Sequence, residues 1–413
     1  MIDRGATARP PRLLWVNHFA VAPDMGGGTR HFEMGRELVR RGWSVTVAAS
    51  DFHLHGRVYL RRTGAEDRSP KPEVLDEVGF VWLWAAPYEK NDWRRVWNWL
   101  SFGRSLSRWI RAGERPDVIV GSTPHLFAAF AAWRAARRYR VPFVLEVRDL
   151  WPESLAVGGA RRGPTYWALH ALARFLYRAA DRIVVLAQGV GDFLARAGVA
   201  PHRIVHAPNG VDVAAYPQSA HTPRASLRLA YAGAHGPANG LDAVLEAATI
   251  LREEPRVTFD LVGDGPSKPS LVEAARTRGL DNVRFREPIS KRAMPAFLAD
   301  CDAGLMVLKD VPLFSFGVSP NKLFDYWGAS LPVVCNVPGD VANMVRESGG
   351  GIQARDASGA ALADAIRGLL AFPPAERAAM GERGRTWVAR ERDRPVLTAR
   401  LDGALRRLLG GTA

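Results

Sequence analysis

The feature that most constrains the fold is an alternation of short buried strands with helical segments. Runs rich in β-branched and aromatic residues are separated by segments with the 3.6-residue period of an amphipathic helix. The first series of such runs is LLWVNHF (13–19), WSVTVAAS (43–50), FVWLWAAP (80–87), DVIVGS (117–122), PFVLEVRD (142–149), DRIVVLA (181–187) and RIVHAPN (203–209). Strands that are apolar throughout and alternate with helices predict a parallel α/β sheet covered on both faces.

The alternation stops at 210–226, a segment with two prolines and with neither the helical nor the strand period. It resumes after that segment. The second series is LRLAYAG (227–233), VTFDLVG (257–263), NVRFRE (282–287), AGLMVLK (303–309), LPVVCNV (331–337) and GGIQA (350–354). We predict two Rossmann-like domains with a cleft between the carboxyl ends of their strands. The expected boundaries are 1–210 for the first domain, 211–226 for a linker, 227–390 for the second domain, and 391–413 for a helix that packs back on the first domain.

The net charge of +14 invites a polyanionic partner such as nucleic acid, an anionic membrane surface or a phosphorylated substrate. Of the 56 basic residues only six are lysine, and no long run of like charges occurs. The preference for arginine over lysine is explained by a biased genomic base composition as well as by selection for binding a polyanion. We therefore expect an ordinary solvated surface with a weak attraction to anionic membranes and no nucleic-acid site.

Cysteine usage and hydropathy indicate the compartment. Cys301 and Cys335 match no metal-ligand spacing and form no disulfide framework, which favours a reducing environment. The sequence shows neither a signal-peptide pattern at its start nor a run of about 18 apolar residues. We expect a cytoplasmic protein whose contact with the inner face of the cytoplasmic membrane is peripheral.

Glycine-containing loops follow several predicted strands at the edge where ligands bind in such sheets. In the first domain, Gly27 and Gly28 lead into a helix at Thr29, whose exposed N–H groups suit an anion. This loop lacks the dinucleotide fingerprint, and a flexible loop without a ligand is the alternative. Two loops of the second domain, 233–240 and 261–268, together predict a diphosphate ligand. The candidate residues for binding it are Gly233, His235, Gly263, Asp264, Gly265 and Lys268.

The segment SPNKLFDYWGASLPVV (319–334) predicts a helix that starts at the ligand. Ser319 suits the N-cap and Pro320 the first helical position, and Asn321 follows in the first turn. The helix dipole and Lys322 favour a diphosphate, and Asp325 lies where a carboxylate can accept hydrogen bonds from the two hydroxyls of a ribose. An ion pair between Lys322 and Asp325 on a solvated face is the alternative.

Further candidate site residues follow two strands of the first domain. EVRDLWPES (146–154) gathers Glu146, Arg148 and Asp149 ahead of Trp151 at the end of a strand, and Asp149 is the best candidate among them for a general base. A structural ion pair of Arg148 is the alternative. His125, on a loop after DVIVGS, is either catalytic or a buried, hydrogen-bonded histidine.

The stretch DWRRVWNWLSFGRSLSRWIR (92–111) predicts an amphipathic helix. The expected core face is Val96, Trp99, Leu100, Phe102, Leu106, Trp109 and Ile110, with arginines gathered on the other side. Its leading end, with Tyr88, Asn91 and Trp93, comes directly off a strand at the mouth of the first domain. Trp93 and Trp97 are also expected to contact an anionic membrane.

Taken in order, these motifs resemble glycosyltransferase family four over nearly the whole chain. The matching segments are GGGTRHFEMGRELVRRGWSVTV, EVRDLWPESL, HAPNGVD, AYAGAHGPANGLDAVLEAA, LVGDGPSKPSLVEAA and SPNKLFDYWGASLPVV. The combination of YEKNDWRRVWNWLSF, EVRDLWPES and GAHGPANGLD is similar to a bacterial subgroup with L-N-acetylfucosaminyl transferases of surface-polysaccharide assembly. The resemblance implies the GT-B fold, an α/β architecture of two facing Rossmann-like domains with parallel sheets and an interdomain cleft.

The resemblance also implies a reaction. A sugar, such as an N-acetylated deoxyhexose, would pass from a UDP-sugar to a polyprenyl-diphosphate-linked saccharide in O-antigen lipopolysaccharide or capsule synthesis, with retention of configuration and without a metal or other cofactor. The donor would bind the second domain and the acceptor the first. Asp149 would then orient or deprotonate the acceptor hydroxyl, and the acceptor would contact Tyr88, Asn91, Trp93, Glu146, Arg148 and Trp151. The D-x-D sequence at 300–302 is expected to hold no metal. A nucleotide-sugar epimerase is the alternative function.

The chain departs from the family pattern at two places. Asp325 falls where the family has the ribose-binding second glutamate of its Glu, seven residues, Glu motif, whereas Gly317 replaces the first. The first donor-domain loop has a histidine and an asparagine in place of the arginine and lysine of many relatives. Lys268 and Lys322 are therefore expected to share the neutralisation of the diphosphate. The residues assigned to catalysis are Asp149, His125 and Lys322.

Overall fold

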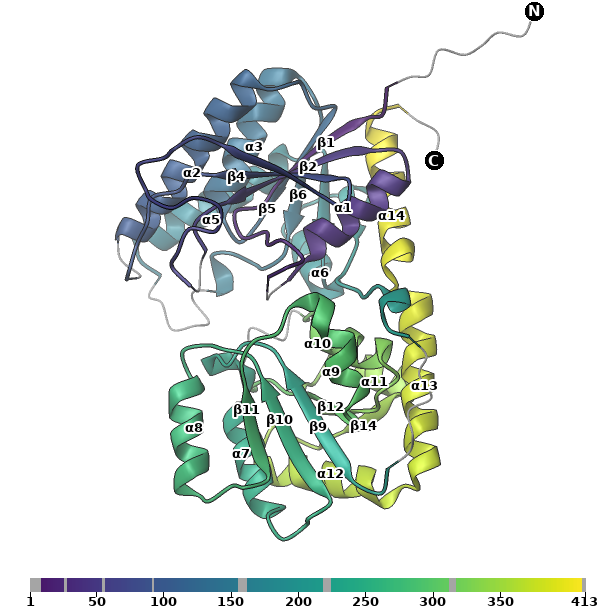
Figure 1. Cartoon of the computed structure of the whole chain (residues 1–413). Helices are drawn as coiled ribbons and strands as arrows, with labels where there is room; N and C mark the ends of the chain where they lie inside the picture. The colour runs from purple at the N-terminus through teal and green to yellow at the C-terminus, as the bar shows by residue number, and fades with distance from the viewer. Residues whose placement is uncertain are drawn as a thin grey trace, which may run out of the picture.

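The computed structural model describes residues 9–25, 28–53, 56–90, 93–154, 162–217, 224–311 and 317–410. They form two sheets flanked by helices, one above the other in Figure 1. The expected α/β class with two Rossmann-like units is confirmed.

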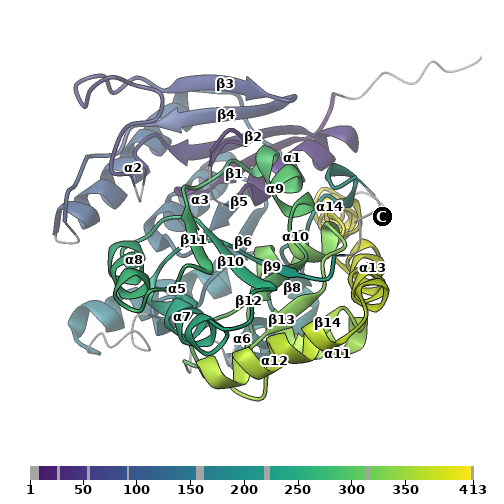
Figure 2. The same ribbon diagram turned by 60° about the horizontal axis from the view of Figure 1, so that its bottom comes forward.

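An eight-stranded sheet forms the first unit, in the order β3-β4-β2-β1-β5-β6-β7-β8. Its strands are β1 (Arg12–Val16), β2 (Ser44–Ser50), β3 (Lys71–Leu75), β4 (Val78–Leu83), β5 (Val118–Ser122), β6 (Phe143–Val147), β7 (Arg182–Val185) and β8 (Ile204–His206). The expectation of a wholly parallel sheet is wrong at one edge, where β3 pairs antiparallel with β4 (Figure 2). Asp76 and Glu77 both have positive φ, 43° and 69°, and make the tight turn between these strands.

Helices cover both faces of this sheet. They are α1 (Arg30–Arg40), α2 (Trp93–Ala112), α3 (Leu126–Tyr139), α5 (Pro164–Ala179), α6 (Gln188–Arg196) and α14 (Arg394–Leu408). Successive strand residues point to opposite faces, so Leu14 of β1 packs toward α2, α3 and α5, while Leu13 packs toward α1. On the α1 side, Leu401 and Leu405 of α14 complete the core. The C-terminal helix thus packs on the first sheet (Figure 1).

A six-stranded parallel sheet forms the second unit, in the order β11-β10-β9-β12-β13-β14. Its strands are β9 (Leu227–Ala232), β10 (Val257–Val262), β11 (Val283–Arg286), β12 (Ala303–Met306), β13 (Val333–Cys335) and β14 (Gly351–Gln353). One face is covered by α7 (Leu241–Ile250), α8 (Lys268–Thr277) and α12 (Gly359–Ala371). The other is covered by α9 (Met294–Ala299), α10 (Asn321–Gly328), α11 (Asp340–Ser348) and α13 (Pro374–Glu391).

The chain passes between the two units twice, and the two passages pair with each other. The N–H of Val211 donates to the carbonyl of Arg392 at 3.1 Å, and the N–H of Arg394 donates to the carbonyl of Val211 at 2.9 Å. The expected linker is not featureless, because Val213–Ala215 forms a short 3-10 helix and both Val211 and Tyr216 are buried in the core of the second unit. The two passages are therefore held by backbone hydrogen bonds to each other, and the first is also held by its buried side chains.

Fewer apolar side chains of α2 are buried in the core than its sequence predicts. Val96 and Leu100, expected inside, are 42% and 40% exposed. Asn98 and Ser101 are buried instead, because their side chains bond the backbone of Ala86, at 2.7 Å to its carbonyl and 2.8 Å from its N–H. Among the described helices, none combines the length and apolar content needed to cross a membrane.

Candidate functional site

Helix α10 begins one residue later than expected and is approached by a tethered loop. It starts at Asn321, with Pro320 in extended conformation before it. The assignment of Ser319 as N-cap is wrong, because its hydroxyl accepts the N–H of Asn209 at 2.8 Å and its carbonyl accepts the side-chain amide of Asn209, also at 2.8 Å. The start of α10 is thus tied to the segment that enters from the first unit. Asn321 itself is exposed.

Asp325 is held by partners other than Lys322. Its carboxylate accepts the hydroxyl of Tyr216 at 2.9 Å and pairs with the ammonium of Lys291. The residue is 7% exposed. The alternative of a solvated pair with Lys322 is therefore wrong, and Lys322 is left to face the glycine loop.

Lys322 lies under the first donor loop. Its ammonium donates to the hydroxyl of Tyr231 at 3.0 Å and sits 4.1 Å from the centre of that ring. A Cβ on Gly233 would lie 3.3 Å from the Lys322 ammonium, so the loop and the lysine are in close contact. Loss of water around the ammonium lowers the pKa of Lys322 to about 7.

The two donor-domain loops interlock through their backbones. His235 donates its N–H to the carbonyl of Asp264 at 2.8 Å and accepts the N–H of Ser267 at 2.9 Å. Gly263 and Gly265 have φ of +144° and +156°, and a Cβ on them would lie 1.9 Å from the Gly233 carbonyl oxygen and 2.6 Å from that of His235. Glycine is needed at both places because there is no room for a side chain.

His235 and Lys268 occupy different environments within these loops. The His235 ring is fully buried, neither of its nitrogens has a partner among the described residues, and burial lowers its pKa to about 4. It is therefore a neutral ring beneath the loop. Lys268 begins α8 and reaches the carbonyl of Arg286 at 3.2 Å and the exposed carboxylate of Glu287 at 2.8 Å.

The first unit meets this donor side at the loop before α1. A Cβ on Gly28 would lie 3.9 Å from the side chains of both Arg148 and Asn321. Gly28 thus separates the predicted acceptor segment from the start of α10 across the gap between the units. Gly27 lies outside the described residues.

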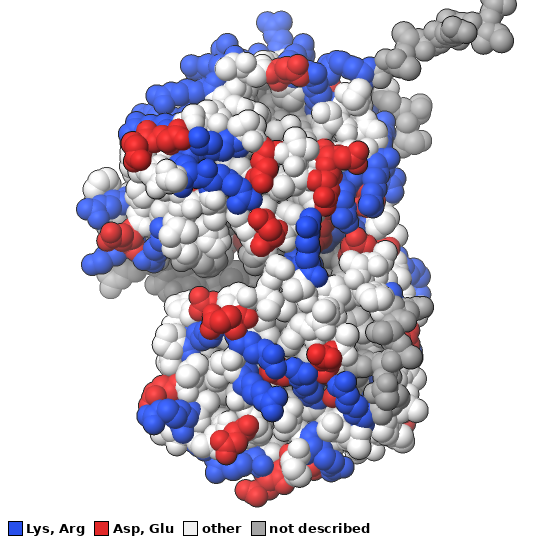
Figure 3. All heavy atoms as spheres, viewed as in Figure 1, with Lys and Arg blue, Asp and Glu red and all other residues white. Residues whose placement is uncertain are grey.

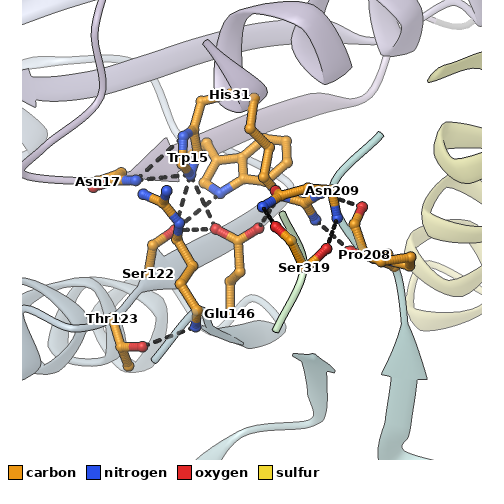
Figure 4. Close-up of polar contacts among 12 residues, drawn as sticks. Trp15, Asn17, His31, Ser122, Thr123, Glu146, Pro208, Asn209 and Ser319 are labelled. Carbon is orange, nitrogen blue, oxygen red and sulfur yellow. Dashed lines mark hydrogen bonds and ion pairs between the residues drawn. The ribbon is translucent and has the colours of Figure 1, made fainter. Parts of the chain in front are cut away.

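Glu146 is buried at the centre of a polar network and is not on an acceptor surface. Its carboxylate accepts Arg30 at 2.8 Å, His31 at 2.9 Å and the hydroxyl of Ser122 at 2.6 Å (Figure 4). Burial alone would raise the pKa of Glu146, but the positive charge of Arg30 and the hydrogen bond with His31 hold it well below its usual range. The assignment of Glu146 to acceptor binding is therefore wrong.

Arg148 and Asp149, unlike Glu146, lie at the gap between the two units. Asp149 is exposed, and among the described residues its carboxylate has no hydrogen-bond or ion-pair partner. Loss of water near the surrounding protein raises the pKa of its carboxyl, and the charge of Arg148 opposes that rise. Arg148 donates its N–H to the hydroxyl of Thr123 at 3.0 Å. Trp151, half-buried, packs edge-on against Trp99 at 5.7 Å. Asp149 is free to meet a ligand.

His125 is a buried capping residue. Its Nδ1 accepts the N–H of Ala128 at 2.8 Å at the start of α3, and its ring stacks on His18 at 4.4 Å. Burial and the neighbouring His18 lower its pKa well below the usual value. The geometry matches the alternative of a buried, hydrogen-bonded histidine, although Nε2 has no partner within the described part of the chain.

The remaining acceptor candidates differ in exposure. Tyr88 is 5% exposed and packs against Phe52, so it belongs to the core and not to an acceptor surface. Trp93 is 70% exposed at the start of α2. Asn91 lies outside the described residues.

Sequence comparison identifies both units. Residues 25–210 match the family model of the glycosyl transferase 4-like domain, and residues 226–371 match that of the glycosyl transferases group 1. Together these matches span most of the chain. The chain belongs to the GT4-like glycosyltransferases.

Two curated relatives resemble this GT4-like chain over part of their length. The putative colanic acid biosynthesis glycosyl transferase WcaI of Escherichia coli K12 is 28% identical over 254 residues, which are 56% of this chain and 62% of that protein. The probable glycosyltransferase WbjE of Pseudomonas aeruginosa is 26% identical over 257 residues, 57% of this chain and 62% of that protein. Each alignment covers less than two thirds of the relative.

Solved structures confirm the GT-B fold. Sucrose-phosphate synthase from Thermosynechococcus elongatus superposes with a TM-score of 0.77 at 16% identity, covering 97% of this chain and 99% of that one. Anabaena Alr3699/HepE in complex with UDP and glucose gives 0.71 at 16% identity, covering 96% and 100%. WaaG, a glycosyltransferase involved in lipopolysaccharide biosynthesis, gives 0.67 at 16% identity, covering 97% and 100%.

Sequence reasoning missed several residues of the site. Tyr216 and Lys291, which hold Asp325, lie in segments without a motif, and Tyr231 reads as an ordinary strand residue. Asn209 falls within HAPNGVD, a segment that the family resemblance singled out without giving the asparagine a role. That motif was the signal from which its tie to Ser319 could have been found.

Proposed function

We propose that this GT4-like protein transfers a sugar from a UDP-sugar to a lipid-linked saccharide of bacterial surface-polysaccharide assembly, with retention of configuration and without a metal. The observation that carries the proposal is the close approach of Gly28 to both Arg148 and Asn321. Asn321 starts α10 and precedes Lys322, while Arg148 precedes Asp149, so this approach supports a site shared by the two segments. Relatives named for colanic acid and lipopolysaccharide synthesis, and a fold neighbour bound to UDP, support the substrate classes.

Each side chain has a role that follows from its surroundings. The donor diphosphate lies against the glycine loops at the start of α10, where backbone N–H groups and Lys322 stabilise the charge of the departing phosphate. Asp325 accepts the ribose hydroxyls. Asp149 orients the acceptor hydroxyl, whose proton passes to the leaving phosphate or to Asp149 itself. The family matches favour transfer over epimerisation.

The donor part of this proposal is tested with a panel of UDP-sugars. Binding to the folded protein raises its unfolding temperature, so the matching donor is expected to give the largest rise. Asp325→Asn should reduce the rise, whereas Asp364→Asn, an exposed carboxylate of α12 that pairs with Arg355, is the matched control. No rise with any UDP-sugar or with UDP would contradict the donor assignment.

The acceptor part is tested at Asp149. Asp149→Asn keeps the shape of the side chain but removes its charge, so turnover is expected to fall by about 100-fold while UDP affinity stays within twofold. Release of UDP from the matching donor, with membrane extract as the acceptor source, reports turnover. Equal losses of turnover and UDP affinity would place Asp149 in donor binding instead.

We also propose that the first unit docks on an anionic membrane through α2, α3 and α5. Helix α3 contacts both α2 and α5, and the three helices contain, in chain order, five, three and two arginines but no Asp or Glu. Figure 3 shows Lys and Arg side chains along the edge of the first unit where α2 and α3 lie in Figure 1. Trp93 and Trp97 are 70% and 42% exposed one turn apart, and Trp167 of α5 is 56% exposed. Exposed indoles among arginines suit a lipid interface.

Vesicle sedimentation tests the docking surface. Replacing Trp93 and Trp97 together with Ser should lower binding to vesicles of phosphatidylglycerol by about tenfold, because two buried indoles are lost from the lipid. Val272→Ser, at a position 42% exposed on α8 of the second unit, is the matched control and should leave binding unchanged. If all three proteins sedimented equally, Trp93 and Trp97 would not contribute to membrane binding.

A further inference from the structure

The buried side chain of Arg30 joins the first unit to the segment that leaves it. Arg30 is 2% exposed, in the first turn of α1. Its Nε donates to Glu146 at 2.8 Å, while its two terminal nitrogens donate to the carbonyls of Pro208 at 2.6 Å and Ala207 at 2.7 Å. A planar guanidinium can satisfy three such acceptors at fixed angles. Arg30 therefore fixes both the position and the direction of the chain at 207–208.

Glu146 prevents Arg30 from moving independently of the sheet. It lies at the end of β6 and is also bound by Ser122 at the end of β5 and by His31 (Figure 4). If this buried charge pair lost one partner, the charge of the other would be left uncompensated in the protein interior. The anchor for residues 207–208 is consequently the carboxyl edge of the first sheet, beside Arg148 and Asp149.

The segment anchored in this way holds α10 at two points. Asn209, the next residue, makes its two 2.8 Å bonds to Ser319 just before α10, as Figure 4 shows. Seven residues later, Tyr216 donates to Asp325 within α10 at 2.9 Å. One short segment thus runs from the acceptor edge of the first unit to both the approach and the body of the donor helix.

We propose that Arg30 is a positioning residue that sets the donor site of the second unit through residues 207–216 without touching either substrate. It keeps residues 317–320 in place just before α10, and with them Lys322 and Asp325 for the nucleotide. The inference deepens the proposed function and rests on it for the identity of the ligand. A purely structural role would stabilise the first unit without affecting a helix of the second.

Double-mutant analysis of UDP binding tests the proposal. Arg30→Lys keeps the charge beside Glu146 but cannot reach three acceptors, so UDP affinity measured by calorimetry should fall about fivefold. Asn209→Ala should give a similar fall, because it cuts the same connection beyond Arg30. In the Asn209→Ala protein, Arg30→Lys should have little further effect, since both changes act through one path. Arg40→Lys, whose partner is Glu37 of the same helix, is the matched control and should bind UDP normally.

Hydrogen exchange gives a readout that needs no ligand. Arg30→Lys and Asn209→Ala should each speed exchange of the amides at 317–325 several-fold while β9 and β10 stay protected. Unchanged exchange at 317–325, or losses of UDP affinity that multiply in the double mutant, would overturn the proposal. If Arg30→Lys does not fold, exchange of the amides at 317–325 in Asn209→Ala tests whether residues 207–216 hold α10 in place. Failure of the wild-type protein to bind UDP would contradict the proposed function, while the exchange result would still judge Arg30.

Discussion

At the scale of the residue, Lys322 carries a charge that depends on pH within the working range. Burial lowers its pKa to about 7, whereas the charge of a bound diphosphate would raise it again. Binding therefore requires the protonated form, which is present below the pKa of the free protein and is lost as pH rises through it. UDP affinity is expected to fall by up to about tenfold per pH unit between pH 7 and 9.

Calorimetry in buffers of different ionisation enthalpy measures the predicted proton uptake directly. At pH 8 the wild-type protein should take up nearly one proton for each UDP bound. Lys322→Arg keeps its charge throughout, so its affinity should hardly change over the same range. An equally steep fall in Lys322→Arg would assign the pH dependence to another group.

Asp325 is predicted to serve stability as well as binding. Asp325→Ala leaves the Tyr216 hydroxyl and the Lys291 ammonium without their acceptor, and should lower the free energy of unfolding by about 2–3 kcal/mol. Asp325→Asn keeps an acceptor for Tyr216 and should cost about 1 kcal/mol. Urea unfolding measures both. A loss in Asp325→Asn as large as in Asp325→Ala would mean that charge, and not the hydrogen bond, holds Tyr216.

The sequence located this residue but could not supply its partners. Asp325 stands in a recognisable motif on an amphipathic helix, so its position follows from local pattern. Tyr216 and Lys291 reach it from other segments, one of them between the two units, and such contacts depend on tertiary packing that no local period encodes. Glu146 was misassigned for the same reason, because its burial results from Arg30 and His31 arriving from α1.

At the scale of the element, the two glycine loops of the donor domain form one unit. Gly265 has φ of +156°, and a Cβ there would lie 2.6 Å from the carbonyl oxygen of His235. Gly265→Ala should therefore push the loops apart, lowering the free energy of unfolding by about 2 kcal/mol and UDP affinity by about tenfold. Gly279→Ala, also at positive φ (61°) but with open space around it, is the control for backbone strain alone.

Urea unfolding and UDP calorimetry on both variants separate the two effects. Gly279→Ala should lose about 1 kcal/mol of stability without a change in affinity. If Gly265→Ala bound UDP as tightly as the wild type, the interlocked loops would not shape the donor site.

Most elements could be predicted because they are buried strands and amphipathic helices with strong periods. The edge strand β3 was missed because KPEVL has no apolar run, and its turn uses Asp76 and Glu77 in place of the usual glycine. The inward face of α2 was mispredicted because Asn98 and Ser101 satisfy the backbone of Ala86, and an apolar count on a helical wheel gives such bonds no weight.

At the scale of the whole molecule, the first unit is completed by the end of the chain. Arg394, at the start of α14, is 3% exposed, pairs with Glu33 of α1 and donates to the carbonyl of Gly210 at 2.6 Å. The first turn of α1 thus contacts both passages between the units, one through Arg30 and the other through Glu33. Buried polar bonds at these passages therefore help to fix the placement of the two units relative to each other.

Buried histidines are predicted to make the whole protein sensitive to mild acid. Burial lowers the pKa of His18 to about 3 and those of His31, His206 and His235 to about 4, against an ordinary value near 6.5. The unfolded chain therefore binds more protons than the folded one below about pH 6.5, and stability falls as pH drops from there toward 4. Each such histidine steepens the fall by up to about 1.4 kcal/mol per pH unit.

Urea unfolding at pH 7, 6 and 5 tests this sign and size. The free energy of unfolding should fall by several kcal/mol between pH 6 and 5, since several histidines act together. In His206→Gln the free energy of unfolding should fall less steeply with pH, by the contribution of one histidine. Glutamine does not titrate, and the half-buried site tolerates its size. His202→Gln, at an exposed position, is the matched control. A stability that stayed level from pH 7 to 5 would show that these rings gain partners or water on protonation that offset their burial.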